Sequence, residues 1–238
     1  MADTASRLPV ERRQRALIGI SGPARRSLTH RLIQLGLRLC GAESRYIRPG
    51  STIGPWELDG LVLSGGTHIH PELYGQQPEV MAPYDRRRDE TDWQLMEMAH
   101  RTGLPVLGIC RGAQFINIYR NGTLCQDVTP LRVYTRHRPL LLPMQTVRVV
   151  RGSRLANVLG AHTLGANRIH SQAINRLGRR LQVVALDNDG FVQGIEHNGQ
   201  HWLLGVQWHP EYLLYHPLHR QLFRQLVAAA ERFRGARA

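Results

Sequence analysis

The first half of the chain alternates short apolar runs with segments whose apolar residues recur at helical spacing. Residues 16–20 (ALIGI) form an apolar run of strand length, and residues 28–39 carry apolar side chains every three or four positions. A second run, DGLVLSGG at 59–66, ends in a glycine pair, which is typical of a buried strand that feeds a loop close to a ligand. The pattern predicts strands followed by helices, the order of a parallel sheet.

The same alternation continues to residue 122. Residues 89–103 (DETDWQLMEMAHRTG) begin with acidic residues and end at Gly103, which predicts a helix with both ends marked. PVLGI at 105–109 predicts the next strand, and residues 112–122 (GAQFINIYRNG) predict a helix that ends at an Asn-Gly pair.

The second half changes from helices to strands. Residues 144–152 (MQTVRVVRG) alternate, and 181–197 (LQVVALDNDGFVQGIEH) predict two strands joined by an Asn-Asp-Gly turn. Residues 200–211 predict a further strand, and 217–234 a closing helix. We therefore expect an α/β fold, a mostly parallel sheet covered by helices with an antiparallel extension.

A length of 238 residues suits one domain, which we place at residues 16–238 after a polar tail at 1–15. Hydrophobic residues make up 42% and charged residues 21%, as in globular proteins with a sizeable core. The apolar run after the tail is too short for a signal-peptide core or a membrane span, so we expect a cytoplasmic protein with no membrane partner.

The charge is strongly basic, with a formal net value of +13, and all 31 basic residues are arginine because the chain contains no lysine. Such a balance raises the question of nucleic-acid binding. The arginines, however, are scattered along the chain, and one cluster lies beside Asp85, Asp89 and Glu90. No helix-turn-helix or RNA-recognition signature accompanies them. We therefore expect no nucleic-acid partner.

The three cysteines, Cys40, Cys110 and Cys125, show no CxxC spacing, which argues against a disulfide framework and a zinc ribbon. We expect Cys40 and Cys125 to be structural. Histidines at 68–70 and 209–219 match no zinc motif, so neither a metal nor another cofactor is expected.

Cys110 differs from the other two because it stands in Gly108-Ile109-Cys110-Arg111-Gly112, where a predicted strand meets a predicted helix. A buried structural thiol is the ordinary interpretation of a lone cysteine. A tight strand-to-helix turn flanked by glycines instead exposes a nucleophile, and the N-terminus of the helix favours a thiolate and stabilises an oxyanion. A nucleophilic cysteine also needs a base and a group that orients it.

His209 and Glu211 supply both groups. In an extended segment they point to the same side, because side chains alternate along a strand. Pro210 between them lacks a backbone donor, which fits the end of a strand. We predict a catalytic triad of Cys110, His209 and Glu211.

At these residues the sequence resembles the class I glutamine amidotransferases and their hydrolase relatives, the peptidase C26 group. The resemblance covers nearly the whole chain, in the segments LDGLVLSGG, PELYG, RRD, PVLGICRGAQ, NGTLCQD, NRIHSQAINRLGRRLQVVA and LLGVQWHPE. It implies the flavodoxin-like class I glutamine amidotransferase fold and a Cys-His-Glu triad. It also implies a γ-glutamyl thioester on the cysteine, which water hydrolyses.

The resemblance further implies an oxyanion hole built from the backbone N–H groups of Arg111 and of a glycine in SGG, for which we choose Gly66. Arg88 either pairs with Asp89 or Asp92 or faces the substrate's α-carboxylate. For Tyr74 the alternative to a substrate contact is a packing role, and for His170 it is to hold its loop in place. The expected substrate-binding residues are Gly65, Tyr74, Gln114, Arg168 and His170.

CRGAQ together with SGGTHIHPELYG is most similar to the γ-glutamyl-γ-aminobutyrate hydrolases of polyamine breakdown, which act alone on a small-molecule γ-glutamyl substrate. The chain departs from them at Arg168, where they tend to carry serine, and at Ser171, where they tend to carry histidine. A hydrolase of a γ-glutamyl-nucleotide amidate, or a glutaminase subunit that supplies ammonia to a separate synthetase, therefore remains an alternative. An intact triad argues against a silent binding protein, and the sequence leaves a monomer or a homodimer open.

Overall fold

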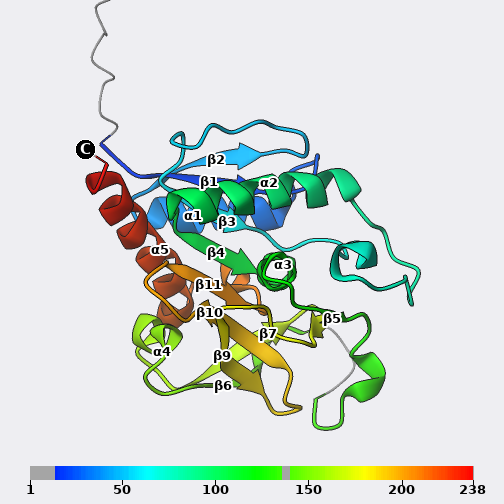
Figure 1. Cartoon of the computed structure of the whole chain (residues 1–238). Helices are drawn as coiled ribbons and strands as arrows, with labels where there is room; N and C mark the ends of the chain where they lie inside the picture. The colour runs from blue at the N-terminus through cyan, green and yellow to red at the C-terminus, as the bar shows by residue number, and fades with distance from the viewer. Residues whose placement is uncertain (1–13, 136–139, 238) are drawn as a thin grey trace, which may run out of the picture.

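One mixed sheet runs through the molecule, and its strand order divides it into a parallel and an antiparallel half (Figure 1). The structure is a computed structural model that describes residues 14–135 and 140–237. Within these residues the sheet has nine strands in the order β2-β1-β3-β4-β11-β10-β9-β6-β7. The polar tail expected at 1–15 lies outside the described residues except for its last two.

The parallel half is built from strands that are buried on both faces, apart from the edge strand β2, as expected for strands covered by helices on each side. All four pairings from β2 to β11 are parallel. These strands are β1 (Leu17–Ser21), β2 (Glu43–Ile47), β3 (Gly60–Leu63), β4 (Val106–Ile109) and β11 (Leu203–Val206).

The antiparallel half continues the sheet from β11. The predicted hairpin is confirmed, since β9 and β10 pair across the turn that contains Asn188, Asp189 and Gly190. The strands are β10 (Val192–His197), β9 (Leu181–Asp187), β6 (Leu140–Val149) and β7 (Thr163–Arg168). A separate two-stranded sheet joins β5 (Leu124–Cys125) to β8 (Ala173–Ile174).

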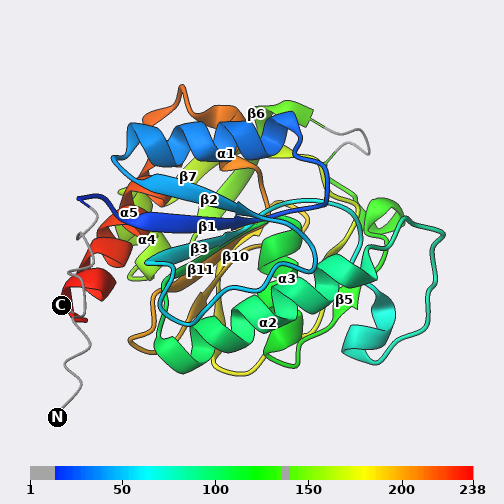
Figure 2. The ribbon, with the colours of Figure 1, turned by 90° about the horizontal axis from the view of Figure 1, so that it is seen from above.

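Helices cover both faces of the parallel half (Figure 2). α1 (Leu28–Leu39) and α5 (Pro217–Gly235) pack on one face with α4 (Arg154–Leu159) farther along it. α2 (Arg86–Thr102) and α3 (Arg111–Tyr119) pack on the other. Short 3-10 helices complete the fold: η1 (Pro71–Tyr74), η2 (Thr129–Leu131) and η3 (Pro210–Leu213).

The two cores follow from alternation along the strands. In β1, Ile18 and Ile20 enter the core on the α1 side, whereas Leu17 enters the core on the α2 side.

None of the helices in residues 14–135 and 140–237 is both long and apolar enough to cross a lipid bilayer.

Helix α2 begins at Arg86, three residues before the segment in which the sequence pattern predicted it. The Asp85 side chain accepts a hydrogen bond from the backbone N–H of Arg88 and caps the helix, and Gly103 ends it with a positive φ of 75°. The cap extends the helix so that Arg88, Asp89 and Asp92 all lie on its buried side.

Helix α3 approaches strand β3 most closely at Gly112. A Cβ atom built there would lie 2.0 Å from the carbonyl oxygen of Leu63, a backbone atom that cannot rotate away. Only glycine allows the start of α3 to lie against the end of β3.

We expect Gly112→Ala to lower the free energy of unfolding by about 3 kcal/mol, the upper end for an overpacked site, because the obstructing atom belongs to a backbone. Gly235→Ala is the matched control, since a Cβ at Gly235 meets no atom within 4 Å. Urea unfolding of both variants measures the difference. Equal stability of the two variants would show that α3 can move away from β3.

Candidate active site

Cys110 occupies the turn between β4 and α3, at the N-cap position of the helix. Its φ of 52° and ψ of −106° are unusual for a residue other than glycine, a conformation that costs about 1–3 kcal/mol. Hydrogen bonds hold this backbone, from Cys110 N to Val206 O at 2.7 Å and from Gln114 N to Cys110 O at 3.1 Å. The strained turn predicted from the sequence is therefore present, but the expected exposure of the cysteine is wrong, because Cys110 is buried with 5% of its surface exposed.

The glycines on either side of Cys110 are required by close contacts. A Cβ on Gly108 would lie 2.7 Å from the backbone nitrogen of Ala113, in the first turn of α3. Gly112 faces the Leu63 carbonyl on the other side. The turn is thus tight because the helix folds back over the strand that precedes it.

His209 and Glu211 form a buried pair, with 2.7 Å between Nδ1 of the histidine and Oε1 of the glutamate. The argument from strand alternation was wrong, because β11 ends at Val206 and both residues lie beyond it. His209 is the N-cap of η3 and Glu211 lies in its first turn, with Pro210 starting that turn. The tight 3-10 turn, rather than an extended strand, brings the carboxylate to the imidazole.

The electrostatic setting of His209 favours its protonated form. Burial alone would lower the pKa of His209, but the charge of Glu211, the charge of the Cys110 sulfur and hydrogen bonds to both outweigh it. The pKa of His209 is consequently raised well above 6.5. The arrangement therefore suits an imidazolium at His209.

Asn167, near the end of β7, holds the backbone of His209 from both sides. Its Nδ2 donates to His209 O and its Oδ1 accepts from His209 N, each at 2.8 Å. Asn167 is fully buried. The sequence analysis did not identify this role, because a single asparagine near a strand end carries no periodic or spacing signal.

Gln207 is a second residue that sequence reasoning missed. Its Nε2 donates to Sγ of Cys110 at 3.5 Å, and its Oε1 accepts from Nε2 of Gln114 at 3.1 Å. Gln114 Nε2 also donates to Gln172 O at 3.0 Å. Gln114, expected to contact the substrate, thus reaches the cysteine through Gln207 and donates to two protein acceptors.

The loop after β3 lies beside the cysteine, as expected for oxyanion donors. A Cβ on Gly65 would lie 2.6 Å from Cε1 of His209 and 3.6 Å from Cβ of Cys110. A Cβ on Gly66 would instead lie 2.1 Å from Nη1 of Arg88. The glycine pair therefore passes between Cys110 and His209 on one side and the buried side chains of α2 on the other.

Two of the other expected substrate contacts, Tyr74 and Arg168, are buried. Tyr74 packs into the core under η1, and Arg168 ends β7 with 3% of its surface exposed. Burial and the neighbouring Arg132 lower the pKa of His170 to about 3, so its ring is neutral at pH 7. His170 lies near enough to His209 for their charges to interact.

The histidines near η1 have structural partners. His68 Nε2 lies 3.2 Å from Ser171 Oγ, and the His70 side chain caps η1 by accepting from Glu72 N. Among the described residues, no group of three or more histidine, cysteine, aspartate or glutamate side chains is arranged to hold a metal ion.

Comparisons with known proteins find a family model and relatives that match most of the chain. The family model of Peptidase C26 matches residues 56–211. A protein of Schizosaccharomyces pombe named as a candidate glutamine amidotransferase is 37% identical over 164 residues, 67% of this chain and 64% of its own length. The gamma-glutamyl-gamma-aminobutyrate hydrolase of Escherichia coli O157:H7 is 30% identical over 189 residues, 74% of this chain and 73% of its own.

A solved structure shares the fold. It is named as a candidate GMP synthase component from Thermoplasma acidophilum, and it matches with a TM-score of 0.69 at 20% sequence identity. The match covers 94% of this chain and 98% of that one. The expected glutamine amidotransferase fold is therefore confirmed.

We expect Glu211→Gln to lower the pKa of His209, because the change removes the carboxylate charge and leaves the burial that favours neutral imidazole. Titration of the His209 Cε1 signal by NMR measures the shift. Glu231→Gln, at an exposed position of α5, is the control and should leave that signal unchanged. An unaltered His209 pKa in Glu211→Gln would mean that the carboxylate does not stabilise the imidazolium.

Proposed function

Because the chain belongs to the peptidase C26 family of glutamine amidotransferase-like hydrolases, we propose that it cleaves γ-glutamyl amide bonds through a thioester on Cys110. One observation carries the proposal: a cysteine in a strained strand-to-helix turn lies close enough to His209 for its charge to raise the pKa of that histidine, and a buried glutamate lies 2.7 Å from the imidazole. This arrangement supports the proposal that Cys110 is the nucleophile, His209 its base and Glu211 the group that orients the base.

In the proposed reaction the Cys110 sulfur attacks the γ-carbonyl carbon of the substrate and forms a tetrahedral oxyanion. His209 then protonates the departing amine as the C–N bond breaks, which leaves a γ-glutamyl thioester. Water, deprotonated by His209, attacks the thioester and releases glutamate and the free thiolate. Glu211 keeps the imidazole oriented, and the N–H groups of Gly66 and Arg111 stabilise the oxyanion.

We further propose that the leaving amine is larger than ammonia and acidic, of the γ-aminobutyrate type. The similarity to the Escherichia coli hydrolase and the sequence CRGAQ support this choice. Arg168 and Arg132 lie near His170, whose pKa both arginines lower, and His170 in turn lies near His209. Arg132 forms ion pairs with Asp187 at 3.7 Å and Asp189 at 3.9 Å. Beside these pairs, we propose that Arg168 contributes the contact to a carboxylate on the leaving amine.

We expect Cys110→Ala and Cys110→Ser to abolish turnover while the protein stays folded, because the sulfur forms the covalent bond. His209→Ala should be nearly as severe, and Glu211→Ala milder, since it orients the base. Amide hydrolysis and mass spectrometry of the trapped acyl-enzyme measure these effects. Cys125→Ala, which changes a thiol that donates only to Asp127 O, is the control. Turnover by Cys110→Ala would disprove the mechanism.

We expect the isolated protein to hydrolyse γ-glutamyl-γ-aminobutyrate much faster than glutamine, and Arg168→Ala to raise KM more than it lowers kcat. The matched substrate is γ-glutamyl-butylamine, which lacks the carboxylate, so its KM should not change in Arg168→Ala. Amine release by the purified protein, with thermal unfolding as a control for folding, measures both. Hydrolysis of glutamine alone, and only when a second protein is added, would indicate an ammonia-supplying role instead.

A further inference from the structure

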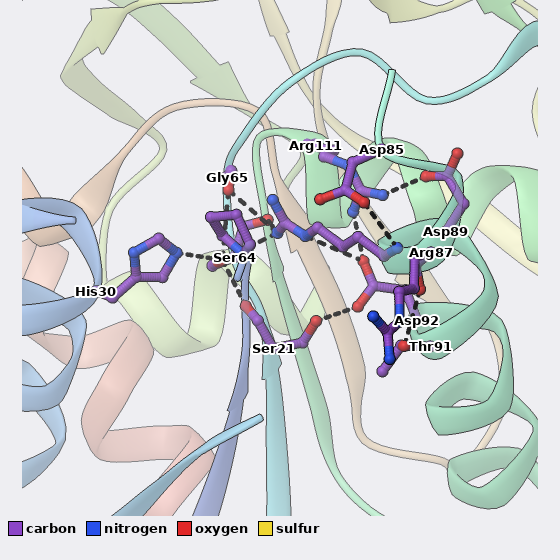
Figure 3. A network of polar contacts seen from close by, with 12 residues as sticks. Ser21, His30, Ser64, Gly65, Asp85, Arg87, Asp89, Thr91, Asp92 and Arg111 are labelled. Atoms are coloured by element: carbon purple, nitrogen blue, oxygen red, sulfur yellow. Dashed lines mark hydrogen bonds and ion pairs between the residues drawn. The ribbon is translucent and has the colours of Figure 1, made fainter. Parts of the chain in front are cut away.

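Three charged side chains on the buried side of α2 lie next to the glycine loop of the candidate site. Arg88, Asp89 and Asp92 are exposed by 1%, 3% and 0%. Removing charges from water is costly unless each one is paired and hydrogen-bonded, so such a cluster persists only where its contacts are specific. Figure 3 shows Asp89 and Asp92 of this cluster on α2, together with Ser64 and Gly65 of the loop after β3.

Arg88 contacts the backbone of the loop directly. Its Nη2 donates to Ser64 O at 2.8 Å, to Ser64 Oγ at 3.0 Å and to Gly65 O at 3.2 Å. Its Nε lies 3.6 Å from the Asp92 carboxylate. On the other side of the loop, His30 Nε2 lies 3.1 Å from Ser64 Oγ, which donates to Ser21 O (Figure 3).

The contact with Gly65 O fixes the direction of the Gly66 N–H. The two groups belong to one planar trans peptide, in which C=O and N–H point in opposite directions. Arg88 therefore turns the Gly66 N–H away from α2. Gly65 faces Cys110 and His209 on that opposite side of the loop. A cation bound to the carbonyl also polarises the peptide and makes its N–H a stronger donor.

The second expected oxyanion donor is anchored to the same helix. The Arg111 side chain, fully buried, forms ion pairs with Asp89 and Asp92 through its two terminal nitrogens. Asp92 thus contacts both Arg88 and Arg111, and Ser21 Oγ donates to its other oxygen. One carboxylate links the loop that carries Gly66 to the turn that carries Arg111.

Resting on the proposed function, we propose that Arg88 is a positioning residue for the oxyanion hole. It orients and polarises the Gly65–Gly66 peptide, and Asp92 keeps that peptide in place relative to Arg111. Arg88 touches no reacting atom and acts through the backbone of the loop. Its removal should weaken the binding of the negatively charged tetrahedral state without changing the binding of the ground state.

The test compares Arg88→Met, which removes the guanidinium, and Arg88→Lys, which keeps the charge, with the wild type. Arg87→Met, an exposed position on the same helix, is the matched control. The measurements are kcat and KM, inhibition by a γ-glutamyl aldehyde and by glutamate, and alkylation of Cys110 by iodoacetamide. The thiolate adds to the aldehyde carbon to give a tetrahedral oxyanion, whereas glutamate does not mimic that state.

For Arg88→Met we expect kcat to fall about 10²-fold and the aldehyde to bind more weakly by the same factor. KM, inhibition by glutamate and the alkylation rate should stay within about twofold. Arg88→Lys should recover part of kcat. If Arg88→Met does not fold, the comparison of Arg88→Lys with the wild type is the test. One ammonium cannot bind Ser64 O, Gly65 O and Asp92 at the same time. In Arg88→Lys, kcat and the affinity for the aldehyde must therefore still fall by the same factor.

A wild-type kcat in Arg88→Met would overturn the inference. The inference would also be overturned if, in Arg88→Met, glutamate affinity and the rate of Cys110 alkylation fell by the same factor as kcat. That result would indicate that Arg88 supports the structure of the whole site. Failure of the proposed function looks different: the wild type then hydrolyses no γ-glutamyl conjugate. The ratio of aldehyde affinities between wild type and Arg88→Met still decides the inference in that case.

Discussion

The contact between Gly112 and the carbonyl of Leu63 determines where the reactive groups of this protein meet. Leu63 is the last residue of β3, and the glycine loop follows it directly. Gly112 lies two residues after Cys110, in the first turn of α3. A Cβ added to Gly112 would lie 2.0 Å from the carbonyl oxygen, so no side chain fits between the two elements. The close packing of α3 against β3 therefore sets the distance between Cys110 and the glycine loop beside it.

Some of the arginines that make this protein basic lie in its interior. A net charge of +13 from arginines scattered along the chain would ordinarily indicate side chains exposed to solvent. Arg88, Arg111, Arg132 and Arg168 are nonetheless buried. The planar guanidinium forms several directed hydrogen bonds at once, which lets one side chain hold carbonyls and a carboxylate together. Part of the basic composition thus contributes to internal architecture, with aspartates supplying the balancing charge.

The sequence predicted local structure where the spacing of apolar residues or a steric requirement acts on residues that are close together in the chain. Apolar spacing predicted α1, β3 and β4, and the glycines around Cys110 predicted the strained turn. The strand β2 was missed because its residues, ESRYI, are half exposed at the sheet edge and show little apolar signal. Pairing of His209 with Glu211 was predicted, but from a strand geometry that the 3-10 turn replaces.

Contacts between polar residues far apart in the chain could not be predicted in this way. Asn167 meets His209 across 42 positions, and Arg111 meets Asp92 across 19. Such pairs produce no periodic pattern in the sequence, because the packing of whole helices and strands determines which residues meet. The core elements of the fold follow from local pattern, whereas the support of the candidate site follows from tertiary packing.

Strand β11 has a consequence for how the chain acquires its shape during synthesis. It is the last strand in the sequence, yet it lies in the middle of the sheet between β4 and β10. The ribosome synthesises the chain from its N-terminus. Until residues 203–206 emerge, no strand pairs with both β4 of the parallel half and β10 of the antiparallel half. Insertion of a late central strand is a high-contact-order event, and such events are slow. The turn that carries Cys110 can therefore form on a nascent chain well before His209 is synthesised, and the candidate site is complete only after residue 211 has emerged.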